Sequence, residues 1–259
     1  MGLNNFLEEM HALIDNIVSS EVTIQKINVI PDTIPLDGNH WLELDEISCV
    51  FVDMVGSTGL NASTSDSVKI YETFIKSLVK ILSTFEAQYI DIKGDGAFGI
   101  FSGKDSAVPA LCAAVTFYTV CRRFLEDKFN SFKIQMHAGI DTDRVLVKRI
   151  GLRGEKNNEV WVGKPVNIAA KLASIAPANT IYVSERTYST LSKREYSQYL
   201  IKSCGCPNGQ RNNLWESKEN NFPFLRLSNY YSLGSQWCLQ HGEQFCQEVI
   251  DIYRKTKKS

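Results

Sequence analysis

Asp53 lies where a carboxylate can do chemistry, at the end of an apolar run and directly before a turn. The run Ile47–Asp53 has the composition of a buried strand. A carboxylate at the end of such a strand is costly to desolvate, so it favours a cation or several hydrogen-bond donors. Residues 54–58 include a glycine and small hydroxyl side chains, typical of a turn whose N–H groups face an anion. Taken alone, Asp53 is more simply explained as a cap of this turn.

A second carboxylate, Asp95, lies in the turn of a predicted hairpin with strands Gln88–Ile92 and Ala97–Phe101. We expect this hairpin to pair beside the strand of Asp53, which places the two carboxylates side by side. Such a pair repels unless it shares divalent metal, and two-metal phosphoryl chemistry uses this arrangement. Asp-Gly is also what a hairpin turn prefers, so Asp95 alone indicates little.

A third candidate is a predicted helix that begins near Pro165 and carries Asn167 and Lys171. The two residues are spaced i and i+4, so they share one face of the helix. A neutral donor and a cation on adjacent turns suit a ribose and a charged phosphate. The alternative is an ordinary solvated helix face.

Four of the seven cysteines lie beyond residue 200. Cys204, Cys206, Cys238, Cys246 and His241 are side chains of the types that bind zinc. The C-x-C spacing and the long gap before Cys238 are atypical of a zinc site, so the sequence favours free thiols over a metal site. Free thiols and the absence of a secretion signal predict a reducing, cytoplasmic location.

The sequence patterns also predict the helices and strands that would position these candidate residues. The patterns predict an amphipathic helix over 4–19, a helix starting at Ser65 and Asp66, and another starting near Ser106. They also predict strands over 132–140 and 144–149, the second returning antiparallel to the first, and over 181–184. This mixture predicts an α+β fold with a ferredoxin-like antiparallel sheet.

Composition limits the organisation and the partners of the chain. With 259 residues, we expect an N-terminal helix and linker over 1–40, a catalytic domain over 41–195 and a C-terminal appendage over 196–259 with its own small apolar cluster. A net charge of −1 argues against general binding to nucleic acid. The longest apolar run, Pro109–Cys121, is shorter than the ~20 residues of a membrane span, so no membrane anchor is expected.

The three motif stretches together resemble the catalytic core of the class III nucleotidyl cyclases. The resemblance rests on residues 51–58, 93–98 and 162–172, in that order, and runs from about Ile47 to Leu191. It implies that Asp53, Asp95 and the carbonyl of Met54 hold two Mg²⁺ or Mn²⁺ ions while a 3′-hydroxyl attacks the α-phosphate. It also implies a head-to-tail homodimer with shared active sites, with Asn167 orienting the ribose. The triphosphate is expected on the turn formed by Val55, Gly56, Ser57 and Thr58.

The chain departs from the family pattern at the positions that select the base and at the position that stabilises the transition state. Asp91 stands where adenylyl cyclases have a base-selecting Lys, and Val160 where they have a base-selecting Asp. Lys171 replaces an Arg that is thought to stabilise the transition state, which keeps the charge and loses the bidentate fork. Phe51 shares the strand face of Asp53, so its ring is expected to shorten the pocket and favour a smaller base.

These departures, with the Glu159–Trp161 run and the cysteine-containing C-terminal segment, look most like the bacterial anti-phage pyrimidine cyclases, the Pycsar cyclases. That resemblance implies UTP or CTP as substrate and a separate effector protein that senses the cyclic product. Asp91 can accept a hydrogen bond from uracil N3–H or from the cytosine amino group, so it does not choose between them. Two alternatives remain: an adenylate or guanylate cyclase with atypical base contacts, and a cyclase-like module that senses nucleotide without turnover.

Overall fold

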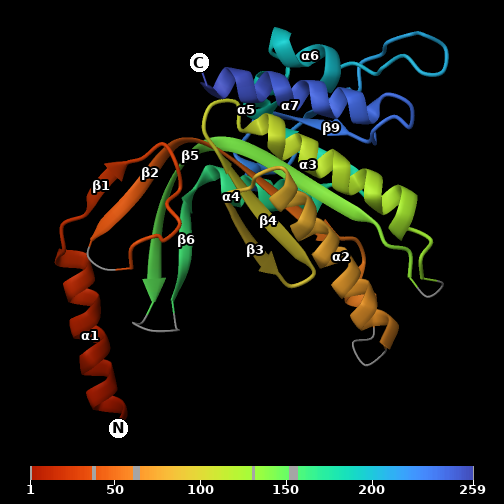
Figure 1. Ribbon diagram of the computed structural model, residues 1–259. Helices are drawn as coiled ribbons and strands as arrows, with labels where there is room; N and C mark the ends of the chain where they lie inside the picture. The colour runs from red at the N-terminus through yellow and green to blue at the C-terminus, as the bar shows by residue number, and fades with distance from the viewer. Residues whose placement is uncertain (1, 37–38, 61–64, 130–131, 152–156, 259) are drawn as a thin grey trace.

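A strongly curved mixed sheet organises the chain, shown in the computed structural model of Figure 1. The structure describes residues 2–36, 39–60, 65–129, 132–151 and 157–258. Within these ranges nine strands form one sheet of order β3-β4-β2-β5-β7-β9-β8, with β1 pairing onto β2 and β6 onto β5. The strands are Thr23–Lys26 (β1), His40–Met54 (β2), Tyr89–Lys93 (β3), Gly96–Ser102 (β4), Met136–Gly151 (β5), Asn157–Gly163 (β6), Thr180–Ser184 (β7), Trp215–Glu219 (β8) and Asn229–Leu233 (β9).

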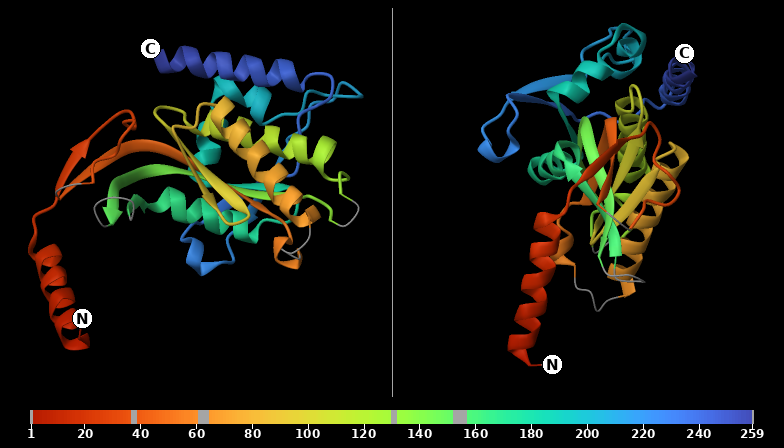
Figure 2. Two further views of the ribbon diagram at one scale, coloured as in Figure 1. Left: turned by 60° about the horizontal axis from the view of Figure 1, so that its bottom comes forward. Right: turned by 90° about the vertical axis from the view of Figure 1, so that its left-hand side faces the viewer.

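The helices cover both faces of this sheet and confirm the predicted ferredoxin-like class of fold (Figure 2). They are Leu3–Ser19 (α1), Ser65–Thr84 (α2), Ala107–Val120 (α3), Lys164–Ile175 (α4), Glu185–Leu191 (α5), Arg194–Leu200 (α6) and Gly242–Lys258 (α7), with short turns Ser57–Gly59 (η1), Cys121–Leu125 (η2) and Pro223–Leu225 (η3). The predicted starts near residues 4, 65, 106 and 165 are each within about two residues of those observed.

The two central strands, β2 and β5, pair antiparallel over most of their length and place Asp53 opposite His137. Strand β5 runs unbroken from Met136 to Gly151. The expectation that 144–149 returns antiparallel to the strand before it is therefore wrong, because both stretches belong to β5 and its antiparallel return is β6. The first of the two predicted strands also begins at Met136 rather than at residue 132.

Alternate residues of β2 point to opposite faces, and this decides which helix faces the candidate site. Val50, Val52 and Met54 pack into the main core with α2 and α3. Phe51 and Asp53 point to the other face, which α4 crosses. The contact there is very close: a Cβ on Gly139 of β5 would lie 2.5 Å from the backbone nitrogen of Ala173 in α4.

The C-terminal segment belongs to the same sheet and core. Strand β9 pairs with β7 on one side and with β8 on the other. The expectation of a separate apolar cluster is wrong, because the buried side chains of this segment pack with residues that precede it. Leu225 and Tyr230 join a cluster with Ile168 and Leu172 of α4. The others join the main core, among them Tyr196, Leu200, Trp215, Leu233, Val249 and Tyr253. Helix α7 packs against α3 and α6.

Two helices differ in whether their apolar residues are buried: those of α3 are, and those of α1 are not. Together α3 and η2, Ala107–Leu125, are long and apolar enough to span a membrane, which revises the shorter run seen in the sequence. However, 72% of this stretch is buried inside the protein, where α3 forms the centre of the core. The predicted amphipathic helix α1 is present, but none of its residues is buried, and it projects from the body of the molecule (Figure 1).

Candidate active site

The first predicted metal-binding carboxylate, Asp53, lies against the turn that carries the second, Asp95. Strands β2 and β4 pair through Val52 and Ala97, so the next position, Asp53, faces Gly96, the residue after Asp95. A Cβ on Gly96 would lie 2.6 Å from Oδ1 of Asp53. Glycine at this position therefore lets the Asp53 carboxylate lie directly against the turn that carries Asp95.

Side chains from neighbouring elements hold both carboxylates. The Ser57 hydroxyl donates a hydrogen bond to Oδ2 of Asp95, which joins the turn after β2 to the β3–β4 hairpin. Oδ2 of Asp53 lies 3.8 Å from Nε2 of His137, whose Nδ1 lies 3.1 Å from the carbonyl oxygen of Ala176.

The pKa of His137 reports the negative charge at this site. Burial lowers that pKa, but the contact with Asp53, the bond to Ala176 and the charges of Asp53 and Asp95 together raise it above its usual value. The negative charge of both carboxylates therefore reaches His137.

The donors gathered here fit a divalent cation. Two carboxylates and a backbone carbonyl are hard oxygen ligands, which suit Mg²⁺ and Mn²⁺ better than they suit zinc or copper. Asp53 is about a third exposed, so an ion and a substrate could both reach it. The carbonyl of Met54 remains a predicted third ligand.

The turn after β2 has the backbone conformation expected of a tight turn. Gly56 has φ of 72°, in the left-handed region that favours glycine. The N–H of Val55 donates to the carbonyl of Gln135 at 3.0 Å, so Val55 does not offer this donor to a phosphate. That leaves Gly56, Ser57 and Thr58 as the predicted phosphate-binding positions of the turn.

Asn167 and Lys171 lie on α4, but their side chains do not meet the two carboxylates. The amide of Asn167 donates to the carbonyl of Gly163 at 3.2 Å. Nζ of Lys171 donates to the carbonyl of Phe224 at 2.9 Å and lies 5.8 Å from the centre of the Phe224 ring. Both residues line a cavity of about 500 Å³ together with Arg186 and residues 224–227, and neither aspartate is part of its lining.

The separation follows from the length of α4. Its C-terminal end lies at His137, beside Asp53, through the carbonyl of Ala176. Asn167 lies nine residues earlier, which is roughly 14 Å along a helix. Within one chain the carboxylates of Asp53 and Asp95 therefore lie apart from Asn167 and Lys171.

Two of the residues predicted to face the base, Phe51 and Asp91, share one side of the sheet. Asp91 of β3 pairs with Phe98 of β4, which in turn pairs with Phe51 of β2. The Phe51 and Phe98 rings stack with centres 6.4 Å apart, so an aromatic surface lies between Asp91 and the strand of Asp53. The Asp91 carboxylate is paired with Nζ of Lys93 at 2.6 Å.

Tyr89 of β3 contacts strand β6 on the same side of the sheet as Asp91. The Tyr89 hydroxyl donates to Oε2 of Glu159 at 3.4 Å, and its ring lies 5.0 Å from that of Trp161. Burial, followed by the charges of Asp91 and Glu159, raises the pKa of Tyr89 to about 12. Val160, between Glu159 and Trp161, is 37% exposed. Side chains alternate along a strand, so Val160 points to the opposite face from Glu159 and Trp161 and therefore away from Asp91. The prediction that Val160 faces the base beside Asp91 is wrong within one chain.

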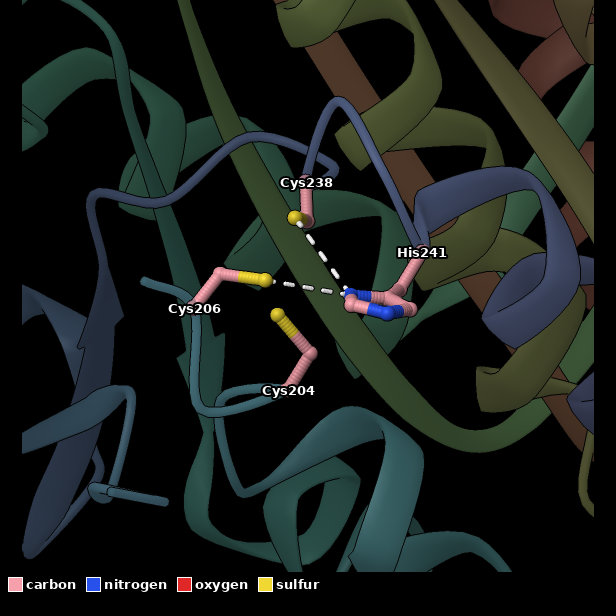
Figure 3. A group of neighbouring side chains, drawn as sticks. All are labelled: Cys204, Cys206, Cys238 and His241. Atoms are coloured by element: carbon pink, nitrogen blue, oxygen red, sulfur yellow. Dashed lines mark hydrogen bonds between the residues drawn. The ribbon is translucent and has the colours of Figure 1, made fainter. Parts of the chain in front are cut away.

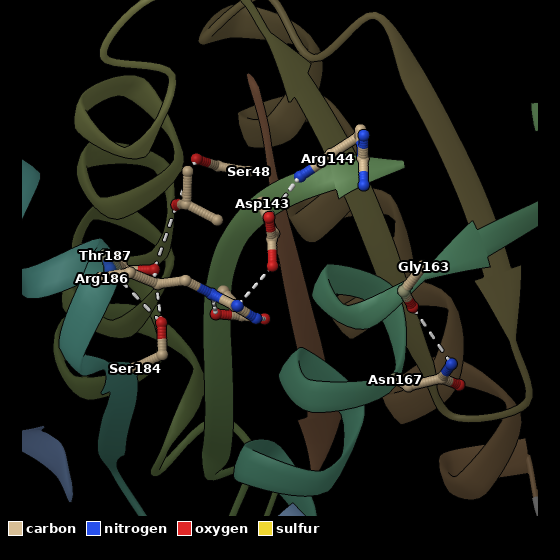
Figure 4. Close-up of polar contacts among 10 residues, drawn as sticks. Ser48, Asp143, Arg144, Gly163, Asn167, Ser184, Arg186 and Thr187 are labelled. Carbon is tan, nitrogen blue, oxygen red and sulfur yellow. Dashed lines mark hydrogen bonds and ion pairs between the residues drawn. The ribbon is translucent and has the colours of Figure 1, made fainter. Parts of the chain in front are cut away.

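Sequence reasoning missed Arg186 of α5. Its guanidinium binds both oxygens of Asp141, one of them at 2.8 Å. It also binds Asp143, as Figure 4 shows. Asp141 is fully buried; burial raises its pKa, and Arg186 opposes that rise. Two aspartates at alternate positions of a buried strand require a cation, and that signal could have pointed to a basic partner.

The comparison with protein families agrees with this geometry. Residues 41–206 match the model described as the adenylate and guanylate cyclase catalytic domain, which is more than half of the chain. The chain belongs to the class III nucleotidyl cyclases. The resemblance seen in the three motifs is therefore confirmed, and the protein is a nucleotidyl cyclase, a family whose members use divalent metal ions.

Curated relatives extend the match beyond the catalytic motifs. The cyclase is 32% identical over 223 residues to a uridylate cyclase of Propioniciclava tarda, covering 81% of this chain and 70% of that one. It is 30% identical over 233 residues to a uridylate cyclase of Micromonospora echinofusca, covering 85% and 74%.

Solved structures share the fold. The adenylyl cyclase CyaB of P. aeruginosa aligns with a TM-score of 0.61 at 18% identity, over 76% of this cyclase and 96% of that chain. A guanylyl cyclase domain from Blastocladiella emersonii, described as a non-canonical dimer, aligns with a TM-score of 0.55 at 18% identity over 74% and 97%. At these identities the likeness shows the fold and leaves the substrate open.

Proposed function

We propose that this cyclase converts UTP, or CTP, to the 3′,5′-cyclic nucleotide and pyrophosphate. The observation that carries the proposal is the paired carboxylates of Asp53 and Asp95, held against Gly96 and Ser57 in a class III cyclase fold. The two relatives named uridylate cyclase favour UTP.

The proposed mechanism assigns one task to each side chain. Asp53, Asp95 and the carbonyl of Met54 would hold two Mg²⁺ or Mn²⁺ ions, which polarise the phosphate and lower the pKa of the 3′-hydroxyl when bound. The N–H groups of Gly56, Ser57 and Thr58 bind the triphosphate. Asn167 orients the ribose so that the hydroxyl faces the α-phosphate, and Lys171 offsets the charge that develops there.

A homodimer is part of this proposal. Within one chain Asn167 and Lys171 are turned toward Gly163 and Phe224, away from the two aspartates. A second copy, arranged head to tail, would place its α4 beside the carboxylates and complete each site. Lys171 would then leave the carbonyl of Phe224 to reach the phosphate.

The preference for a pyrimidine rests on the residues beside the base. Asp91 is an acceptor for uracil N3–H or the cytosine amino group, and the stacked Phe51 and Phe98 rings occupy space that a purine would need. In the wider proposal the cyclase works in the cytoplasm as part of an anti-phage system, and a separate effector protein senses its product.

Incubation with each of the four ribonucleoside triphosphates and Mn²⁺ tests the proposal. We expect pyrophosphate and cyclic product mainly with UTP or CTP, measured by mass spectrometry of the nucleotides. Turnover of ATP or GTP alone would reject the pyrimidine assignment. Binding without turnover of any of the four would identify a nucleotide-sensing module instead.

Asp91→Ala is expected to lower kcat/KM for the preferred pyrimidine by about tenfold, since it removes a hydrogen bond to a charged acceptor. The loss should fall mainly on KM, because Asp91 binds the base and stays clear of the reacting phosphate. Steady-state kinetics with UTP and CTP measure it. Glu72→Ala on the exposed surface of α2 is the matched control, and an equal loss in both variants would contradict a role for Asp91.

A further inference from the structure

The C-terminal segment gathers four metal-binding side chains at one point. Cys204 and Cys206 follow α6, and Cys238 and His241 precede α7, with β8 and β9 between the two pairs. Among the described residues these four offer ligand atoms that all lie within 4.8 Å of one another. In Figure 3 the three sulfur atoms and Nδ1 of His241 point toward a common centre.

We propose that Cys204, Cys206, Cys238 and His241 bind a structural Zn²⁺ ion. Three thiolates and one imidazole are a complete tetrahedral ligand set that leaves no open position, as in closed zinc sites. The site is separate from the carboxylates of Asp53 and Asp95, and it does not depend on the proposed substrate.

The distances are already near those of a zinc site. Bonds of about 2.3 Å to sulfur and 2.0–2.1 Å to nitrogen place tetrahedral sulfur and nitrogen ligands roughly 3.6 Å apart. In this structure Nδ1 of His241 lies 3.2 Å from Sγ of Cys206 and 4.0 Å from Sγ of Cys238, on either side of that value. Shifts of a few tenths of an ångström would bring these three ligands to zinc geometry.

The backbone around the sulfurs is compact. Gly205 has φ of 93°, and its carbonyl accepts a hydrogen bond from the N–H of Gly209 at 2.6 Å. A Cβ on Gly205 would lie 2.9 Å from the backbone of Gly209, so only glycine fits between the two cysteines. Backbone N–H groups of His241 and Gln240 donate toward Sγ of Cys238 and favour its thiolate form.

Cys246, which the sequence placed with this group, lies elsewhere. Its thiol neighbours the buried Cys112 of α3. The cluster therefore consists of the Cys204–Cys206 pair and the Cys238–His241 pair, and Cys246 provides a cysteine control on the same segment.

Zinc at this point would join three parts of the C-terminal region. Trp237, next to Cys238, is bound to α3: its backbone N–H donates to Oγ1 of Thr119 at 3.0 Å and its indole to Oγ1 of Thr116 at 2.9 Å. An ion shared with Cys204 and Cys206 would link the end of α6 to this anchored segment and to the start of α7. Closing such a loop stabilises the folded state.

Metal analysis of the full-length protein tests the site. After purification in reductant without chelator and incubation with Zn²⁺ alone followed by desalting, we expect about one zinc per chain by mass spectrometry. Cys206→Ser and His241→Ala should each bind less than about 0.1 zinc, whereas Cys246→Ser and Asp53→Asn should keep it. Replacement by Co²⁺ should give the visible bands of a tetrahedral thiolate site in the wild type and in Cys246→Ser.

A stability measurement gives a second readout. A strong chelator should lower the Tm of the wild type and of Cys246→Ser by about 10 °C and leave the Tm of His241→Ala unchanged. Absence of zinc from the reconstituted wild type would overturn the proposal, and so would equal zinc in Cys206→Ser and Cys246→Ser. An intact mass two hydrogens lower, with no bound metal, would identify a disulfide instead.

Discussion

Asp53→Asn is expected to lower kcat for cyclisation at least about a thousandfold, because metal-ion stabilisation of the transition state is worth several kcal/mol. The substitution keeps the size of the side chain and removes the charge that Asp53 and Asp95 present together. Initial rates with saturating UTP and Mn²⁺ measure the effect. The Tm should stay within a few degrees of the wild type, since removing one of two adjacent carboxylates also relieves their repulsion.

Asp45→Asn is the matched control for this experiment. Asp45 lies on the same strand, β2, eight residues before Asp53, and its side chain is 67% exposed. We expect it to keep wild-type activity within about twofold, as surface substitutions usually do. Activity in Asp53→Asn close to that of Asp45→Asn would show that the carboxylate pair does not hold the catalytic ions.

An equimolar mixture of Asp53→Asn and Asn167→Ala chains is expected to recover about a quarter of wild-type activity, although each variant alone is nearly inactive. In a head-to-tail dimer each site takes its carboxylates from one chain and its α4 from the other. A mixed dimer then has one site with both substitutions and one intact site, and random mixing makes half of the dimers mixed.

Chains should be mixed by co-expression with two affinity tags, and the whole pool of dimers assayed for cyclic product. Doubly tagged dimers isolated from this pool, each with one intact site of two, should show about half of the wild-type activity. Asp53→Asn paired with Asp95→Asn is the control, because both changes fall among the carboxylates that one chain gives to a site. In that mixed dimer each site lacks one of the two carboxylates, so we expect no recovery. Full activity of a monomeric fraction in gel filtration would contradict the shared site, and so would an inactive Asp53→Asn and Asn167→Ala mixture.

The local elements of the catalytic region could be predicted because their patterns are short-range. The helical spacing of α2 and the Asp-Gly turn between β3 and β4 are visible in neighbouring residues. The length of β5 could not be predicted, because the burial of its sixteen residues changes along the strand. Its first half is mostly buried and its second half is partly exposed. The alternation that predicted two strands belongs to one strand, β5, which pairs with β2, β6 and β7 along its length.

Distance along the chain also limited what could be seen of the sites. Asp53 and Asp95 could be paired because the hairpin signal implied adjacent strands. Arg186 escaped notice because its partners, Asp141 and Asp143, lie on β5, and β7 joins α5 to that strand only in the folded sheet. The long gap between Cys206 and Cys238 spoke against a metal site, but the fold spans it with β8 and β9 and brings the pairs together.

The position of β9 has a practical consequence for anyone who shortens this protein. The residues that match the family end at 206, yet β9 supplies the outer hydrogen-bonding partner of β7. A chain cut at that boundary would leave β7 as a bare sheet edge, a template for intermolecular pairing and aggregation. It would also lose α7, which lies against α3. The smallest piece suited to crystallisation or engineering therefore extends through α7.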